Sequence, residues 1–334
     1  SGADNLVAYS EGVNAGLGAL KTKPWPYLLL NTKPEAWKPE DTFLVGFAMF
    51  FDLQDEDNER EYKLWQLRNI LPAPIYTLLT QSHSAWDAPL FGEAKHRVVI
   101  PTAEQINLNT YTAPQLAFQP NKLSEAVGSN NFAVAGALTV DGRAIVADDM
   151  HLGLRAPNIW FRARLLTGKN SDVSGFSLPG IPSIIVGSNR HVAWGFTNSY
   201  GDWADFVRVQ WLDAKQTKYL DQTGSEQTVK VFDELIQVKG QQPVSFTVRE
   251  TVWGPITKSI NSSFALALQW SAQQPGALNI GLTQLARSRD LDQALLTAHG
   301  IGMPGQNLVI GDKNGRIAWR LTAQMPNRVG GCDK

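Results

Sequence analysis

Gly128-Ser129-Asn130-Asn131-Phe132 is the stretch that decides the fold prediction, because two apolar runs follow it directly. The runs are Phe132 to Leu138 and Ala144 to Asp148, and Asp141-Gly142 between them predicts the turn of a core β-hairpin. Gly128 adds little bulk beside the next peptide bond, which suits attack on that bond by the Ser129 hydroxyl. Cleavage there would free an α-amino group with a reference pKa of about 7.7–8.0, a base suited to an N-terminal nucleophile. Taken alone, a Gly-Ser pair is more often a plain turn before a strand.

The composition is that of a globular protein. The 334 residues are 43% hydrophobic and 18% charged, and the length predicts about two domains or one large one. A net charge of -1 provides no basic surface, so nucleic acid is not an expected partner. No apolar run approaches the roughly 18 residues that span a bilayer, and Ser1 does not open a signal peptide. The single cysteine, Cys332, excludes an internal disulfide framework.

The chain is predicted to be helical as far as about residue 82. Apolar residues have helical spacing from Val7 to Leu17 and from Tyr62 to Ile70. A third helix, Phe43 to Phe51, follows Pro39-Glu40-Asp41, residue types that suit a first helical turn. From His83 to Val127 the prolines recur without a clean period, which predicts an exposed connector open to proteolytic nicking.

From Ser129 onward the pattern is that of strands separated by turns. One helix is expected from Leu291 to Ala298, with Asp290 as its N-cap. Asn307 to Gly311 and Ile317 to Leu321, joined across Asn314-Gly315, predict a second hairpin. Further strands are predicted at 159–165, 183–186, 191–196 and 206–211, with two or three more between 228 and 252.

Common catalytic and binding motifs are missing from the sequence. Gly175-Phe176-Ser177-Leu178-Pro179-Gly180 has the wrong spacing for the nucleophile elbow of the α/β-hydrolases. The five histidines form no His-x-x-x-His pair, and there is no phosphate-binding or dinucleotide-binding glycine pattern. A Ser-His-Asp triad scattered along the chain stays open, although no motif supports it.

Several ordered stretches together resemble the penicillin acylase family of N-terminal nucleophile (Ntn) hydrolases, which includes acyl-homoserine-lactone and cephalosporin acylases. They are Ser129 to Gly136, Ala147 to Trp160, Gly187 to Asp205, Gln306 to Asp312 and Met325 to Arg328. The resemblance implies an α+β fold, the αββα four-layer sandwich with an α-chain-like helical region. It divides the chain into an α-chain-like part (1–87), a spacer-like part (88–128) and the N-terminal part of the β-chain (129–334).

The resemblance also implies roles for individual residues. Gly128-Ser129 is the self-cleavage bond and Ser129 is the nucleophile. The main-chain N–H of Asn198 and the side-chain amide of Asn307 are the oxyanion donors, a type of group worth about 3–4 kcal/mol each. His151 lies near the nucleophile's amine, and Arg328 orients the active-site network. Each residue also has a purely structural alternative. Asn198 and Asn307 would then belong to local turns. His151 would be a buried, hydrogen-bonded core histidine and Arg328 a surface arginine.

A calcium site is a further implication of the resemblance. Its ligands would be Glu59, Asp202, the carbonyl of Ala204 and Asp205, since Ca²⁺ takes six to eight oxygens and two carboxylates are too few. The alternative is an acidic turn that binds no metal.

The expected activity is hydrolysis of the amide of an N-acylated small molecule, either a penicillin-type β-lactam or an acyl-homoserine lactone. Leu152, Trp160 and Phe176 are candidates for the acyl pocket. If processed, the protein would be a heterodimer of its own α and β pieces, and the family's location is the periplasm or the exterior.

The part from Ser129 to Lys334 is much shorter than the family's β-chain, so we expect a shortened relative. An alternative function follows: an unprocessed, non-catalytic relative that binds acylated ligands. A carbohydrate-binding β-protein is a third possibility, and it rests only on the eleven tryptophans.

Overall fold

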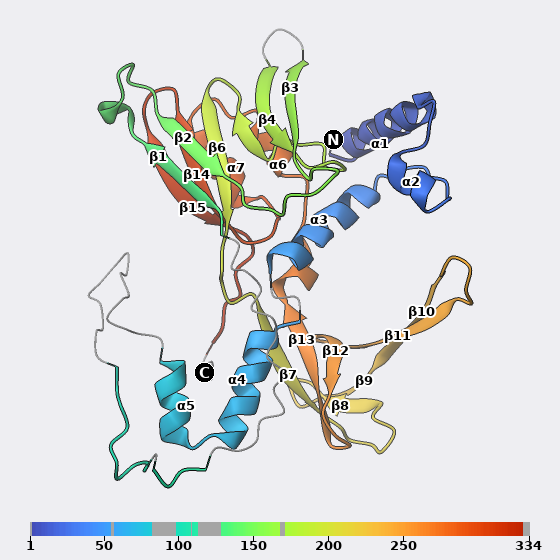
Figure 1. Ribbon diagram of the computed structural model, residues 1–334, viewed down its shortest axis with the longest axis vertical. Coiled ribbons are helices and arrows are strands. Elements are labelled where there is room, and N and C mark those ends of the chain that lie inside the picture. Colours follow the sequence, from blue (N-terminus) through green and yellow to red (C-terminus); the bar gives the residue numbers. More distant parts are fainter. Residues whose placement is uncertain are drawn as a thin grey trace. The chain divides into compact units, whose positions relative to one another are not determined.

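The computed structural model describes residues 2–54, 57–81, 98–107, 109–112, 128–167 and 171–329. Helices fill the first part of the chain and strands the rest, so the predicted α+β class is confirmed (Figure 1). Most of the predicted connector and spacer lies outside the described residues. None of the described helices combines the length and the apolar character that crossing a bilayer requires. The described helices are α1 (Gly2–Ala19), α2 (Trp25–Leu29), α3 (Asp41–Leu53), α4 (Glu59–Ile70), α5 (Ala73–Thr80), α6 (Leu282–Leu285) and α7 (Leu291–His299).

The chain forms two compact units, and each gathers segments that are far apart in the sequence. The first unit contains residues 1–56, 126–203 and 270–326, and the second contains 57–125, 204–269 and 327–334. The first unit is built on a six-stranded sheet in the order β15-β14-β6-β5-β4-β3 (Figure 1). Its strands are β3 (Phe161–Thr167), β4 (Ser171–Ser177), β5 (Val186–Ser188), β6 (Val192–Asn198), β14 (Gln306–Asp312) and β15 (Ile317–Thr322).

Alternation along β6 and β14 gives the central sheet two different faces. Trp194, Phe196, Leu308 and Ile310 are buried in a core that they share with residues of α6 and α7. On the other face, Gly195 of β6 and Gly311 of β14 approach the hairpin of β1 (Asn130–Val134) and β2 (Ile145–Asp149) closely. A Cβ on Gly311 would come within 2.8 Å of the Ala144 side chain. The described residues of the first unit therefore form a helical layer, a central sheet and a covering hairpin.

The hairpin itself is shorter than predicted. The expected strand from Phe132 to Leu138 ends at Val134, and Gly136–Leu138 form a 3-10 turn. The reason is a close backbone crossing: the Gly136 N–H donates to the Gly315 carbonyl at 2.8 Å. A Cβ on Gly136 would lie 2.0 Å from the Gly142 carbonyl oxygen, so only glycine fits this crossing.

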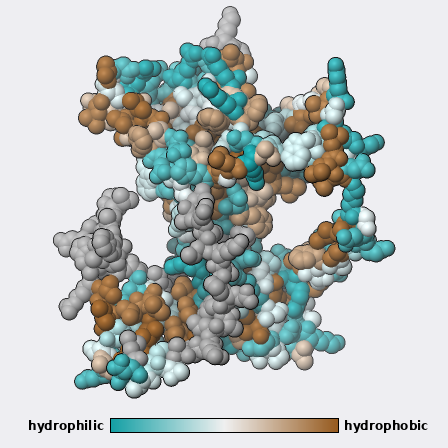
Figure 2. Space-filling view, in the orientation of Figure 1, coloured by the Kyte–Doolittle hydropathy of each residue, from teal (hydrophilic) through white to brown (hydrophobic). Residues whose placement is uncertain are grey.

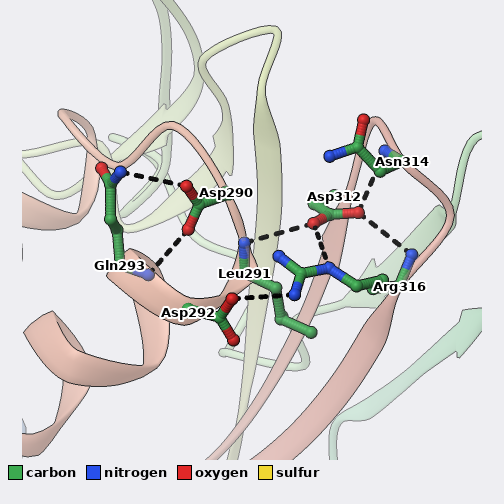
Figure 3. A network of polar contacts seen from close by, with 7 residues as sticks. All are labelled: Asp290, Leu291, Asp292, Gln293, Asp312, Asn314 and Arg316. Atoms are coloured by element: carbon green, nitrogen blue, oxygen red, sulfur yellow. Dashed lines mark hydrogen bonds and ion pairs between the residues drawn. The ribbon is translucent and has the colours of Figure 1, made fainter.

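A buried carboxylate joins the second hairpin to α7 (Figure 3). Asp312 accepts hydrogen bonds from the main-chain N–H of Leu291, Asn314 and Arg316. The Arg316 side chain adds Nε to Asp312 at 3.0 Å and reaches Asp292 at 2.8 Å. Asp290 caps α7 as predicted, because its carboxylate accepts from the Gln293 N–H at 2.9 Å.

The second unit has a five-stranded sheet in the order β10-β11-β12-β13-β7. Its core includes Val209, Trp211, Tyr219, Val229 and Ala267. The predicted strands after residue 204 are present, but β4, β8, β12 and β13 were not predicted, and the strand expected at 183–186 begins at Val186 instead. The strands are β7 (Ala204–Gln210), β8 (Lys218–Leu220), β9 (Glu226–Thr228), β10 (Lys230–Ile236), β11 (Val244–Thr251), β12 (Gly254–Ser259) and β13 (Phe264–Trp270).

Candidate active site

Ser129 stands at the entrance of β1, directly beside the end of β2. The register pairs Asn130 with Asp149 as the outermost pair of the hairpin, and Ser129 directly precedes Asn130. The main-chain N–H of His151 donates to the Ser129 Oγ at 3.0 Å. Two residues that are 22 positions apart in sequence are thus joined by the hairpin, and the serine hydroxyl is held by a main-chain donor.

The His151 side chain has an acidic partner that sequence reasoning missed. Its Nε2 lies 2.8 Å from Asp149 Oδ2. The hydrogen bond with Asp149 raises the pKa of His151, and a hydrogen bond with the main chain of Gly128 adds to the rise. The imidazole therefore lies between a carboxylate and the residue that precedes Ser129. The signal in the sequence was an aspartate two positions before the histidine, on the same face of the extended chain.

Asn131 connects strand β1, which begins directly after Ser129, to the two predicted oxyanion residues. Its Nδ2 donates to the carbonyl of Asn307 at 3.1 Å and lies 3.4 Å from the carbonyl of Gly195. Asn307 in turn donates its own Nδ2 to the Asn198 carbonyl at 3.3 Å. Ser129, His151, Asn198 and Asn307 all belong to the first unit, and contacts through Asn131 join the hairpin to the asparagines.

Both oxyanion candidates are fixed by further hydrogen bonds. Asn307 Oδ1 accepts from Trp319 Nε1 at 3.1 Å, which orients the amide so that Nδ2 is its donor end. The side chain of Asn198 donates to the Leu53 carbonyl at 2.6 Å and accepts from Gln306 Nε2 at 3.2 Å. The Asn198 side chain is therefore committed elsewhere, which leaves the main chain as the part of this residue available for chemistry.

A buried carboxyl lies next to this network and was not singled out in the sequence. Asp148 is the cross-strand partner of Asn131. Among the described residues, neither of its carboxyl oxygens has a hydrogen-bond partner, and both are buried. Burial and then the negative charge of Asp149 raise the pKa of Asp148 to about 7, while the nearby Phe196 N–H and Asn131 amide oppose the rise.

The family model of penicillin amidase matches residues 1–333. The chain belongs to the penicillin amidase family. Two relatives are acyl-homoserine lactone acylases QuiP, from Pseudomonas aeruginosa (27% identical over 97% of this chain and 39% of the relative) and from Pseudomonas fluorescens (29%, 96% and 39%). Penicillin acylase 2 proenzyme from Pseudomonas sp. is 27% identical over 97% of this chain and 42% of its own length.

A solved structure shares the fold. The thermostable penicillin G acylase from Alcaligenes faecalis superposes with a TM-score of 0.55 at 22% identity, over 61% of this chain and 37% of that chain. The fold predicted from the resemblance to the penicillin acylases is thereby confirmed. The chain spans about two fifths of the length of the curated relatives it matches, with 39% of each of the first relatives covered.

Two of the four predicted calcium ligands, Glu59 and Asp205, have cationic partners. In the second unit, Arg328 donates from Nη2 to Asp205 at 2.7 Å and from Nε at 3.0 Å. Lys258 reaches Glu59 at 2.7 Å, and the Ala204 carbonyl lies 3.4 Å from Asn58 Nδ2. Asp202 belongs to the first unit. In the described part of the chain, no group of three or more Asp, Glu, His or Cys side chains is placed to hold a metal ion.

The three candidates for the acyl pocket belong to the first unit, as Ser129 does, and Arg328 belongs to the second, where Asp205 is its partner. In the first unit, Trp160 packs against the main core and Phe176 lies opposite Val186 in the sheet. Leu152, directly after His151, is half-buried.

Proposed function

We propose that the chain cuts its own Gly128–Ser129 bond and that the freed Ser129 is the nucleophile of an amide hydrolase. The observation that carries the proposal is the 3.0 Å hydrogen bond from the His151 N–H to the Ser129 Oγ, with the His151 ring against Gly128. A main-chain donor on the hydroxyl fixes the direction of its lone pairs, and an imidazole beside the scissile peptide is a proton-transfer group in reach.

Self-cleavage would proceed in two steps, formation of an ester and its hydrolysis. The Ser129 Oγ attacks the Gly128 carbonyl carbon, the bond to the Ser129 nitrogen breaks, and an ester joins Gly128 to the side chain. The hydroxyl proton passes to the departing nitrogen. Water then hydrolyses the ester, which leaves a carboxylate on Gly128 and a free amine and hydroxyl on Ser129. The raised pKa of His151 favours the imidazolium, which can donate to the oxygen that gains charge.

Turnover uses the same hydroxyl. The Ser129 amine takes the hydroxyl proton through a water molecule while Oγ attacks the substrate carbonyl. The Asn198 N–H and the Asn307 Nδ2 would hold the oxyanion, for which Asn307 must exchange its present acceptor, the Asn198 carbonyl. The substrate's amine leaves with the proton, and water releases the acid from the acyl-enzyme.

Acyl-homoserine lactones are the preferred substrates in this proposal, with N-acylated β-lactams second. The names of the relatives support this order, since QuiP proteins are acyl-homoserine lactone acylases and the Pseudomonas sp. relative is a penicillin acylase. Both compounds carry an acyl group on an exocyclic amide. The proposal includes a heterodimer of the two pieces and, by resemblance, a location outside the cytoplasm.

Intact-mass measurement of the purified chain tests self-cleavage. We expect two pieces divided before Ser129, one 36.7 kDa species for Ser129→Ala, and normal cleavage for the control Ser263→Ala. Incubation with an acyl-homoserine lactone then tests hydrolysis through release of the free amine. An uncut chain after long incubation would favour the non-catalytic relative, and cleavage of Ser129→Ala would show that another nucleophile acts.

Calcium remains a proposal from the resemblance alone, and it requires Asp205 to exchange Arg328 for the metal. Melting curves with added calcium and with a chelator test it. A calcium-dependent rise in melting temperature that Asp205→Asn abolishes would support the site. Identical curves would leave the ion pair as the role of Asp205.

A further inference from the structure

We propose that Asp148 is a positioning residue that keeps the Ser129 strand seated on the central sheet in its acid form and loosens it on ionisation. Its proton would control the amide of Asn131, which joins strand β1 to Asn307. The inference deepens the proposed function and rests on it for one readout, the rate of self-cleavage.

Geometry puts Asp148 between the hairpin and the sheet. It lies opposite Asn131 in the β1–β2 register, one residue pair inward from the outermost pair, Asn130 and Asp149, which Ser129 directly precedes. Its carboxyl group packs directly on β6, because a Cβ built on Gly195 would be only 2.5 Å from Oδ1. Both carboxyl oxygens are buried and lack hydrogen-bond partners among the described residues. A charge placed here would be desolvated and unpaired, which is unfavourable.

The surrounding elements offer no compensating positive charge. Strands β1 and β6 contain no ionisable side chain, and the one in β14, Asp312, lies at its far end in contact with Arg316. On β2 the neighbour is Asp149, a second carboxylate whose charge disfavours ionisation of Asp148. Asp149 is itself paired with His151. The acid form of Asp148 is thus stable up to about pH 7.

Ionisation would strengthen the attraction of the Asp148 carboxyl group for two nearby donors, the Phe196 N–H and the Asn131 amide. The Asn131 amide now donates to the Asn307 carbonyl at 3.1 Å and lies close enough to Asp148 to lower its pKa. A charged acceptor forms stronger hydrogen bonds than a neutral carbonyl. The carboxylate therefore competes for this amide, and the contact between the Ser129 strand and Asn307 weakens as the pH rises.

The first experiment is independent of self-cleavage. Ser129→Ala is compared with Ser129→Ala/Asp148→Asn, a neutral and nearly isosteric change, by melting temperature and by the NMR shifts of the Asn131 side-chain amide across the range from about pH 5 to about pH 9. Because the pKa of Asp148 in the folded chain lies above 3.8, the ordinary value of an aspartate, stability from the acid form is lost as pH rises toward about 7. We expect the Asp148→Asn chain to gain a growing advantage in melting temperature up to that pH.

The same samples test the link to Asn131. The amide signals, assigned by their loss in Asn131→Ala, should shift with a midpoint near pH 7 only when Asp148 is present. The exposed carboxylate Asp233 provides the matched control, and Asp233→Asn should keep both transitions. A pH-independent difference in melting temperature, or amide shifts that persist in Asp148→Asn, would overturn the inference.

The second experiment measures self-cleavage in the chain with Ser129. Above its pKa the acid form of a carboxyl group decreases about tenfold per pH unit. The ratio of the Asp148→Asn rate to the unsubstituted rate should therefore be constant below about pH 6 and rise toward about tenfold per unit above about pH 7. A ratio of rates that does not change with pH, together with Asn131 amide signals that do shift with pH, would show that Asp148 ionises without positioning Ser129. If no chain cleaves, the proposed function fails while the first experiment still decides the contact.

Discussion

At the scale of single residues, Asp149 sets the proton affinity of the His151 imidazole, whose main-chain N–H contacts Ser129. The hydrogen bond that the His151 imidazole donates to the Asp149 carboxylate raises the pKa of His151 above 6.5, so the imidazolium form is favoured in the folded chain. The stability that comes with it is present below about pH 6.5 and is lost as pH rises through the folded pKa. We expect Asp149→Asn to lower the pKa of His151, measured by NMR titration in the Ser129→Ala background.

The control for that titration is Asp141→Asn, a change in an exposed carboxylate that hydrogen-bonds Arg143. It should leave the His151 curve where it was. An unchanged His151 pKa in Asp149→Asn would contradict the contact seen in the structure. The same substitution removes a negative charge near Asp148, so the pKa of Asp148 should fall too.

Sequence reasoning found part of this residue-scale network. Ser129, His151, Asn198 and Asn307 were predicted through motifs, and they lie in one unit. Asn131, Asp148 and Asp149 were missed because their roles depend on cross-strand register and on burial. A string of residues does not reveal which of two adjacent aspartates faces the sheet until the strand boundaries are known.

At the scale of elements, glycines decide how closely the first hairpin approaches its neighbours. Gly136→Ala would push a methyl group to 2.0 Å from the Gly142 carbonyl oxygen and 2.6 Å from Gly315 Cα, both rigid backbone atoms. We expect a loss of about 3 kcal/mol or more in the free energy of unfolding. Gly16→Ala in α1 is the contrast, because its methyl group would meet no atom within 4 Å.

On the exposed surface of α1, Gly16→Ala should raise the free energy of unfolding by about 0.5–1 kcal/mol. Denaturant unfolding of both variants measures the difference. A Gly136→Ala chain as stable as the unsubstituted chain would show that the backbone crossing between the two hairpins is not as close as described.

The start of α7 provides a second test at this scale (Figure 3). Asp290→Ala removes one N-cap and should cost about 0.5–2 kcal/mol. Asp312→Ala should cost more, about 2–4 kcal/mol, because it leaves several donors and the Arg316 side chain without their buried acceptor. Urea unfolding ranks the two, and a larger loss for Asp290→Ala would reverse the assignment.

Asp312 also predicts a dependence on acid. Burial opposes ionisation, but the hydrogen bonds from Arg316, Leu291 and Asn314 outweigh it and lower the pKa of Asp312. Its contribution is therefore present above about pH 4 and lost as pH falls further. Asp312→Asn should flatten this part of the curve of stability against pH.

Element prediction worked best where a local signal was strong. The capping aspartate of α7 and the Asn-Gly turn between β14 and β15 each define a boundary by local chemistry, and both are confirmed. The strand expected at 183–186 was displaced, because an apolar run shows burial and does not distinguish a strand from a packed loop. Similarly, Gly136 looked like one more strand residue until its contact with Gly315 was known.

At the scale of the whole molecule, chain order and spatial order differ. Each compact unit combines part of the helical segment with strands from more than a hundred residues later. The linear division into 1–87, 88–128 and 129–334 stays a prediction, and its last boundary is the proposed cleavage site. Spatial units could not be predicted, because neither helix nor strand patterns specify which distant segment covers an apolar face.

The surface of the second unit leads to a prediction about association. Strands β10 and β11 form a ribbon with exposed apolar side chains, including Phe232, Ile236 and Phe246, and Figure 2 shows apolar patches on the molecular surface. Since β10 is an edge strand with unpaired main-chain groups, we expect the chain to self-associate as its concentration rises. Phe246→Lys should weaken this association in light scattering, whereas Thr247→Lys should change it less. Monodisperse monomers at all concentrations would contradict the prediction.

The crossing of Gly136 with Gly315 has a consequence for the moment after the backbone parts. A strand whose first residue has just become a free end is normally the first to fray. Here the chain just beyond the opposite end of that strand is held by the hydrogen bond from the Gly136 N–H to the Gly315 carbonyl, so Ser129 stays attached to a strand that is fixed at its far end. The proposed cleavage can therefore free the amine of Ser129 while Ser129 itself keeps its position.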